Sequence, residues 1–153
     1  MHREGVAMPG TLERPPAVAG EHSCWLPRHR KSADRARRLL RDFLARLDGG
    51  EQYLDTGELL LSELVANAIE HARVPPGRLI QVRFELSPTT LRLEVHDANA
   101  SHPTARSAGE DDESGRGLWL VDQLSTSWGC HPRPGGIGKA VWCLIGPARR
   151  SAA

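Results

Sequence analysis

The pattern of apolar and polar positions predicts a first helix in the early part of the chain. It begins with Ser32 as N-cap and runs to about Leu47, because apolar residues recur there at helical spacing. Asp48-Gly49-Gly50 ends it, since glycine favours the turn that stops a helix. The residues expected to face the core are Ala36, Leu39, Leu40, Phe43, Leu44 and Leu47.

A second helix is expected from Asp55 or Thr56 to about Arg73, where Pro75-Pro76-Gly77 cannot continue it. Its apolar arc indicates a buried face. That arc consists of Leu61, Leu64, Val65, Ala68, Ile69 and Ala72.

A different stripe of the second helix carries an acid, an amide and an imidazole. Glu63, Asn67 and His71 are each four residues apart and therefore stack on one side. The helix thus has one face for packing and another that is available for chemistry.

Period-two alternation predicts strands on either side of these helices. Cys24-Trp25-Leu26 is a short strand ended by the proline that follows it. Leu79 to Leu86 and Leu91 to His96 alternate around Ser87-Pro88-Thr89-Thr90 and predict a β-hairpin. Asp97 stands directly at the end of the second strand.

The remaining part of the chain begins with a polar segment, Ala98 to Glu113, that has no periodicity and is expected to form a functional lid or a disordered loop. Ser114-Gly115-Arg116-Gly117 then leads into a short helix over Leu118 to Leu124. Ser127 to Cys130 and Lys139 to Ile145 are the last strands.

This order of elements predicts one domain with an α/β (α+β) two-layer sandwich, in which helices cover one face of a mixed, mainly antiparallel sheet. We expect the domain to span 23–147. Residues 1–22 are expected to form a disordered leader and 148–153 a flexible tail, because both are poor in periodic apolar residues.

Composition narrows the class of protein. A formal charge of +1 over 153 residues argues against a dedicated nucleic-acid binder. Cys24, Cys130 and Cys143 are far apart and lack zinc-like spacing, which favours a reduced, cytoplasmic setting. No apolar run reaches the roughly 20 residues of a membrane span, so we expect no membrane partner.

Basic residues cluster between Arg28 and Arg41. The cluster can be the solvated face of the first helix, or it can be a docking surface for an acidic partner. The sequence leaves both open.

Several catalytic motifs fail on specific positions. A P-loop ending at Gly138-Lys139 would need glycine at Arg133 and a hydroxyl residue at Ala140. A dinucleotide fingerprint starting at Gly115 reaches Leu120 where it needs glycine. No H-E-x-x-H or G-x-S-x-G occurs, so a zinc protease or serine hydrolase has no support.

One constellation remains, and its chemistry suits a nucleotide. The amide oxygen of Asn67 is a hard ligand for Mg²⁺, and Glu63 could accept a proton from an attacking hydroxyl or water. Asp97 could accept a hydrogen bond from an exocyclic amine, and the glycines at Gly115 and Gly117 allow close approach of phosphate to a helix start. Taken singly, each residue also fits an ordinary structural role.

At these residues the chain resembles the Bergerat-type (GHKL) ATP-binding domains of gyrase, heat-shock chaperones of the ninety-kilodalton class, sensor histidine kinases and mismatch-repair ATPases. It is most similar to small actinobacterial proteins related to anti-sigma factor serine/threonine kinases, which have a histidine kinase-like ATPase domain. The motifs that carry the resemblance are Glu63 to Ala72 as N-box, Val95-His96-Asp97 as the first glycine box, Gly115 to Val121 as the second, and the closing strands at Trp128-Gly129 and Gly138 to Trp142.

The resemblance implies ATP and Mg²⁺ as cofactors and a role for each matching residue. Asn67 would hold Mg²⁺, and Glu63 would be the catalytic base that activates a serine or threonine hydroxyl. Asp97 would bind the adenine amine, and His71 would approach the phosphates. The phosphates would be lined by Gly115, Arg116, Gly117 and Leu118.

The resemblance also implies partners. Such proteins bind and inhibit a sigma factor and phosphorylate a STAS-type anti-sigma antagonist protein, and a homodimer is compatible with them. The alternative is a non-catalytic regulator of the same fold that binds proteins in a nucleotide-dependent way. A gyrase-like motor and a sensor histidine kinase are disfavoured, because the chain offers neither a transducer domain nor a sensor before Ser23.

Two departures from the family pattern bear on these alternatives. The first glycine box usually reads D-x-G-x-G, but here it is Asp97-Ala98-Asn99-Ala100-Ser101. The closing strand often has a hydroxyl residue after its glycine, where this chain has Lys139-Ala140. The missing glycines favour the binding regulator, whereas the presence of both Glu63 and Asn67 favours the kinase.

Overall fold

The computed structural model describes residues 18–71, 79–97, 113–133 and 138–147, and for His71 and residues 113–117 it describes only the course of the helix. In chain order the elements are β1 (Gly20–Pro27), α1 (Ser32–Ala45), the short 3₁₀ helix η1 (Gly50–Tyr53), α2 (Leu54–His71), β2 (Leu79–Ser87), β3 (Thr90–Asp97), α3 (Glu113–Leu124), β4 (Ser127–Pro132) and β5 (Lys139–Ile145).

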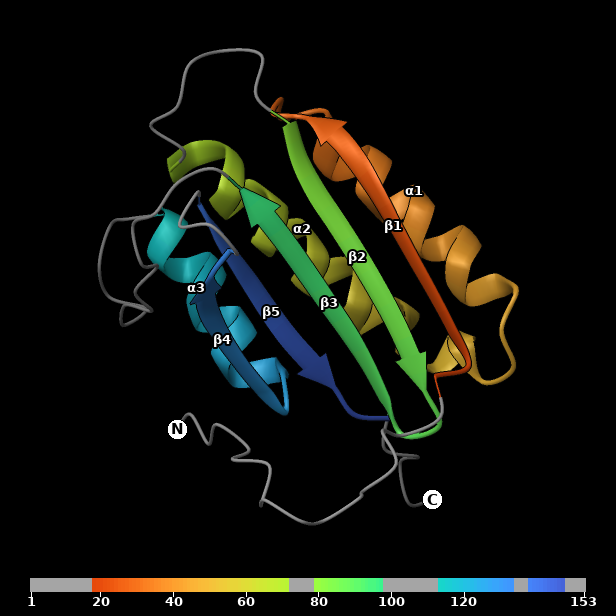
Figure 1. Cartoon of the computed structure of the whole chain (residues 1–153). Helices are drawn as coiled ribbons and strands as arrows, with labels where there is room; N and C mark the ends of the chain where they lie inside the picture. The colour runs from red at the N-terminus through yellow and green to blue at the C-terminus, as the bar shows by residue number, and fades with distance from the viewer. Residues whose placement is uncertain (1–17, 72–78, 98–112, 134–137, 148–153) are drawn as a thin grey trace, which may run out of the picture.

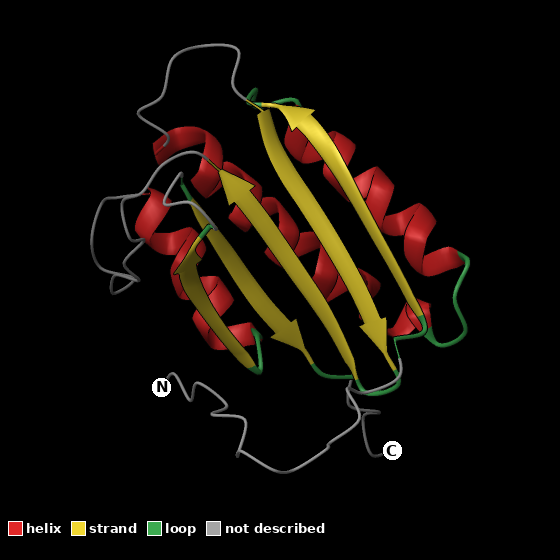
Figure 2. Ribbon diagram, viewed as in Figure 1, coloured by secondary structure: helices red, strands yellow, loops and turns green. Residues whose placement is uncertain are grey.

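The strands form one sheet in the order β1-β2-β3-β5-β4. The three α-helices lie together behind this sheet in Figure 1, and Figure 2 shows the same two layers. The predicted two-layer sandwich and the predicted hairpin of β2 and β3 are confirmed. All four pairings of the described strands are antiparallel, so the parallel pairing of a mixed sheet does not occur among them.

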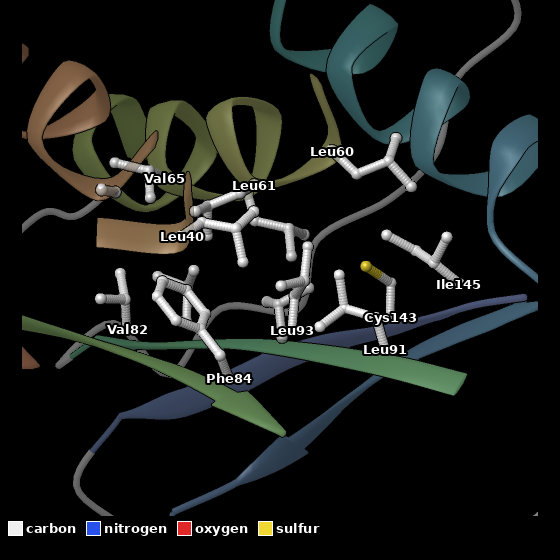
Figure 3. Close-up of a cluster of buried hydrophobic side chains, with 14 of the residues drawn as sticks. Leu40, Leu60, Leu61, Val65, Val82, Phe84, Leu91, Leu93, Cys143 and Ile145 are labelled. Atoms are coloured by element: carbon white, nitrogen blue, oxygen red, sulfur yellow. The ribbon is translucent and has the colours of Figure 1, made fainter. Parts of the chain in front are cut away.

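The core lies between the helices and the inner face of the sheet, as Figure 3 shows. Leu40 of α1 and Leu61 of α2 point toward Phe84 and Leu93 of the central strands, and all four are fully buried. Each such side chain contributes about 2 kcal/mol relative to an exposed position. The predicted core arcs of α1 and α2 are confirmed, with Leu39, Leu47 and Ile69 packed at the margin. Ala72 lies outside the described residues.

Several element ends differ from the sequence prediction. Helix α1 begins at Ser32, but the flanking position is Lys31 and no side chain caps the helix. The Ser32 hydroxyl instead donates to the carbonyl of Pro27 at 2.5 Å. Strand β1 already begins at Gly20, inside the segment that was expected to be a disordered leader. Helix α2 begins at Leu54, because η1 leads directly into it.

Two arginines of the basic cluster connect the first two helices. The guanidinium of Arg37 donates to the Ser62 hydroxyl at 2.8 Å and pairs with Asp34. Arg41 donates to the Glu58 carboxylate at 2.7 and 3.0 Å. Part of the cluster therefore holds α1 against α2, and the docking alternative stays untested.

No helix in the described part of the chain is long and apolar enough to cross a membrane.

Candidate functional site

Four element ends meet at one end of the sandwich, at the upper left in Figure 1. They are the ends of α2 and β3 and the beginnings of α3 and β5. Helix α2 packs against both α3 and β3, which brings segments far apart in sequence together. The N-box helix, the first glycine box and the second glycine box therefore converge on one region.

Two polar side chains are buried on the elements that lead to this end. Asn67 of α2 is 6% exposed, and Asp97, the last residue of β3, is 2% exposed. Leu91, Leu93 and Val95 alternate toward the helices, so Asp97 also lies on the inner face of the sheet. A buried amide and a buried acid at the junction of two layers suit a polar ligand better than a purely apolar core would.

Glu63 lies one turn before Asn67 and is half-buried. Burial raises the pKa of its carboxyl, and the charge of Glu70 raises that pKa further. A carboxylate whose pKa is moved toward neutrality is a better proton acceptor at physiological pH. Its environment therefore suits the predicted role of base.

The second glycine box lies differently from the prediction. Helix α3 begins at Glu113, so Gly115 and Gly117 are inside the helix and do not precede a start at Leu118. The expected boundary was wrong because the polar residues there give no apolar periodicity. Only the first amides of a helix are unpaired, and those of Gly117 and Leu118 lie past that turn. Leu118 is 2% exposed.

Other predicted residues are placed only in part. His71 is the last residue of α2, and Gly115, Arg116 and Gly117 are in the first turns of α3, but their side chains lie outside the described residues. The expected lid lies outside them as well, except for Glu113 at the start of α3. The roles of these residues toward phosphate stay predictions.

The structure places a further residue, Lys139, beside Asp97. The sequence had shown Lys139 only as a departure from the family pattern of the closing strand. Lys139, the first residue of β5, is directly opposite Asp97 in the antiparallel register and is 4% exposed. The charges of both residues affect the thiol of Cys130 on β4. Burial raises the pKa of this thiol, the Lys139 ammonium lowers that pKa, and the Asp97 carboxylate raises it. Only the pairing of β3 with β5, which local pattern does not reveal, places Lys139 here.

The possible metal ligands at this end of the sandwich suit an Mg²⁺ ion that is bound together with a nucleotide better than a metal ion that is held by protein side chains alone. Among the described residues no three His, Cys, Asp or Glu side chains gather as a metal site. Mg²⁺ commonly takes one or two protein oxygens and completes its octahedron with phosphates and water. Asn67 could supply one such oxygen.

Comparison with known proteins gives one family. Residues 26–142 match the model of the histidine kinase-like ATPase domain. A search of curated proteins gave no match. The match begins in β1 and ends in β5, so it contains every element that forms the candidate site.

Domains of this family bind ATP, typically with Mg²⁺. The match extends over most of the chain, and the two-layer sandwich with its converging helix and strand ends agrees with it. This chain belongs to the histidine kinase-like ATPase domain family of GHKL-type ATP-binding proteins.

Proposed function

We propose that this protein is an ATP-dependent serine/threonine kinase of the anti-sigma factor type. The observation that carries the proposal is that the ends of α2 and β3 converge with the start of α3 at one end of the sandwich. Asn67, in the last turns of α2, and Asp97, the last residue of β3, are both buried. Phosphoryl transfer needs mainly positioning and charge neutralisation. Asp97 and Asn67 would position the nucleotide, and the Mg²⁺ that Asn67 would hold would supply the neutralising charge.

In the proposed reaction a serine or threonine hydroxyl of a substrate protein attacks the γ-phosphorus of ATP. Its proton passes to the Glu63 carboxylate, the bond to the β-phosphate oxygen breaks, and ADP leaves. The raised pKa of Glu63 supports this role, because the carboxylate takes up a proton more readily than an exposed glutamate does. Asn67 would hold Mg²⁺, which neutralises charge on the phosphates.

The proposed substrate is a STAS-type anti-sigma antagonist protein. The second proposed partner is a sigma factor, which the protein would bind and inhibit, and phosphorylation would stop the antagonist from displacing it. A homodimer is compatible with this proposal. The support for these partners is the likeness of the motifs to the anti-sigma group, together with the family match.

A non-catalytic, nucleotide-dependent regulator is the second candidate function. The specific observation in its favour is the sequence Ala98-Asn99-Ala100-Ser101 after Asp97, where the family pattern has glycines. A side chain at such positions restricts how closely backbone can approach a nucleotide.

Nucleotide binding is the first step to test. Calorimetric titration with ATP and Mg²⁺ should show binding by the wild type and a clear loss of Mg²⁺-dependent affinity in Asn67→Ala. Gln81→Ala is a suitable control, because Gln81 lies on β2 with its side chain on the opposite face of the sheet. Undiminished Mg²⁺-dependent binding by Asn67→Ala would remove this residue from the site.

Transfer is tested by incubating labelled ATP with the protein and candidate antagonist proteins. The wild type should label a serine or threonine, whereas Glu63→Gln should bind ATP and fail to transfer. Equal transfer by both proteins would remove Glu63 from the mechanism. Tight ATP binding by the wild type without labelling of any antagonist would favour the non-catalytic regulator.

A further inference from the structure

A buried acid and a buried lysine stand side by side at the end of the sheet. Asp97 and Lys139 form the last register pair of β3 and β5, and both are more than nine-tenths buried. Directly opposed residues of an antiparallel pair have Cβ atoms about 5 Å apart and share a face. Their side chains therefore start from neighbouring points on the inner face.

The backbone before Lys139 determines which residue takes this place. Gly138 has φ of +87°, a left-handed conformation that residues with a Cβ adopt only with strain. The carbonyl of Gly138 accepts a hydrogen bond from the amide of Arg133 at 3.1 Å, which closes the connection from β4. Strand β5 then starts with Lys139 inward and Ala140 outward, opposite His96. Lys139, and not Ala140, is thus the residue beside Asp97.

The pair offers complementary hydrogen-bonding groups. An ionised aspartate only accepts hydrogen bonds, and a lysine ammonium only donates them. Adenine presents the same two functions next to each other, because its 6-amino group donates and the flanking ring nitrogens N1 and N7 accept. A side chain with a donor next to Asp97 can therefore read the base atom beside the amine.

We propose that Lys139 is a base-recognition residue, which donates a hydrogen bond to N1 or N7 of adenine while Asp97 accepts one from the 6-amino group. The inference rests on the proposed function, because it assumes that the base of ATP enters at Asp97. Lys139 stands at a position where the family pattern often has a hydroxyl residue. The inference gives this lysine a role in binding the base and predicts how the protein discriminates between bases.

The test compares affinities for ATP, 1-deaza-ATP and 7-deaza-ATP by calorimetry. Loss of a hydrogen bond to a charged donor weakens binding about tenfold to a hundredfold. The wild type should bind one of the two deaza analogues more weakly by this factor, and the affected analogue identifies the ring nitrogen. Lys139→Met should weaken ATP binding similarly and should no longer distinguish ATP from that analogue.

Three controls separate a base contact from a structural role. Lys31→Met removes the only other lysine, which is exposed before α1, and should leave all three affinities unchanged. Lys139→Gln keeps a donor and should retain part of the discrimination. Circular dichroism and thermal unfolding check that each variant is folded.

Two results would overturn the inference alone: equal affinity of the wild type for ATP and both analogues, or unchanged discrimination in Lys139→Met. The wild-type comparison suffices even if no variant folds. GTP binding as tight as ATP binding would overturn the contact of Asp97 with the amine, on which the inference rests, because guanine has an acceptor where adenine has its amine. Absence of binding to any of these nucleotides would overturn the proposed function together with it.

Discussion

Strand β3 buries two carboxylates, one on each face of the sheet, and their surroundings differ. Glu94 lies on the outer face, accepts from Arg92 at 2.8 Å and is 3.1 Å from the ring of His96. Asp97 lies on the inner face at the strand end, opposite Lys139 and next to elements that converge from the other layer.

The partners of Glu94 come from its own strand, two residues before and two residues after it. Burial alone would raise its pKa, but the hydrogen bonds from His96 and Arg92 and their charges lower it to about 2. Arg92 is held in turn over the ring of Trp142, at 4.8 Å from its centroid. The contacts of Glu94 are therefore made within one strand and serve the structure of the sheet, whereas Asp97 is buried where β3 ends, opposite Lys139 of another strand.

The largest expected effect is on stability and comes from Glu94→Ala. A pKa lowered from 4.5 to about 2 corresponds to on the order of 3 kcal/mol at neutral pH. Because the folded pKa is depressed, this contribution is present above the ordinary value of 4.5 and is lost as the pH falls through about 2. Urea denaturation across this pH range measures it.

Glu21→Gln is the matched control for Glu94→Ala. Glu21 lies on the same outer face and pairs with Arg83 at 3.4 Å, but its side chain is 64% exposed, so its removal should change stability by less than about 1 kcal/mol. Equal losses for the two variants would contradict the structural role of the Glu94 contacts. ATP affinity should change in neither variant.

Asp97→Asn is expected to lower ATP affinity, which is the property that the Glu94 variants should leave unchanged. A neutral amide oxygen is a weaker acceptor than a carboxylate, so ATP affinity should fall by about tenfold, as calorimetry with Mg²⁺ would show. Glu94→Gln should leave the affinity unchanged. If Glu94→Gln weakened ATP binding as much as Asp97→Asn, the functional distinction between the two acids would fail.

The two acids also show what sequence can and cannot predict. Alternation alone places Asp97 at the end of a strand and Glu94 on its outer side, because side-chain direction follows from the period of two. Burial of Glu94 depends on its neighbours Arg83 and Trp142 on the adjacent strands. Local patterning does not contain those pairings.

The same distinction applies to the rest of the site. The stripe of Glu63 and Asn67 was predictable, since helical periodicity is local. The position of Lys139 opposite Asp97 was not, because it requires the register of strands about forty residues apart in sequence. The start of α3 at Glu113 was missed because helix beginnings in polar segments lack an apolar signal.

Glu63→Gln is expected to change stability less than Glu94→Ala does and in the opposite direction, so that the protein becomes more stable at neutral pH. Burial, together with Glu70, raises the folded-state pKa of Glu63. The stabilising contribution of a raised pKa is complete below the unfolded value and is lost as the pH rises through the folded value. Removing the charge should therefore raise the melting temperature at neutral pH, and the difference should disappear below the ordinary pKa of 4.5.

Glu70→Gln is the control for Glu63→Gln, because it removes only the smaller cause of the shift and should stabilise the protein less. A lower melting temperature of Glu63→Gln at neutral pH would contradict the assignment. A gain in stability with loss of transfer would place Glu63 among residues that trade stability for activity, in contrast to Glu94.

The smallest effect on stability is expected from Arg41→Ala. This variant removes the ion pair of Arg41 with Glu58, which is exposed to water, whereas the contacts of Glu94 are buried. The side chains of Arg41 and Glu58 are 55% and 22% exposed, so solvent screens their attraction. We expect a loss of about 0.5 kcal/mol in urea denaturation, reduced further by salt. Arg38→Ala is the matched control, because Arg38 is exposed on the same helix and makes no ion pair with another described residue. A loss for Arg41→Ala as large as that for Glu94→Ala would mean that exposure does not distinguish the two ion pairs. A loss about sixfold smaller would support the view that burial between neighbouring strands makes the contacts of Glu94 stabilising.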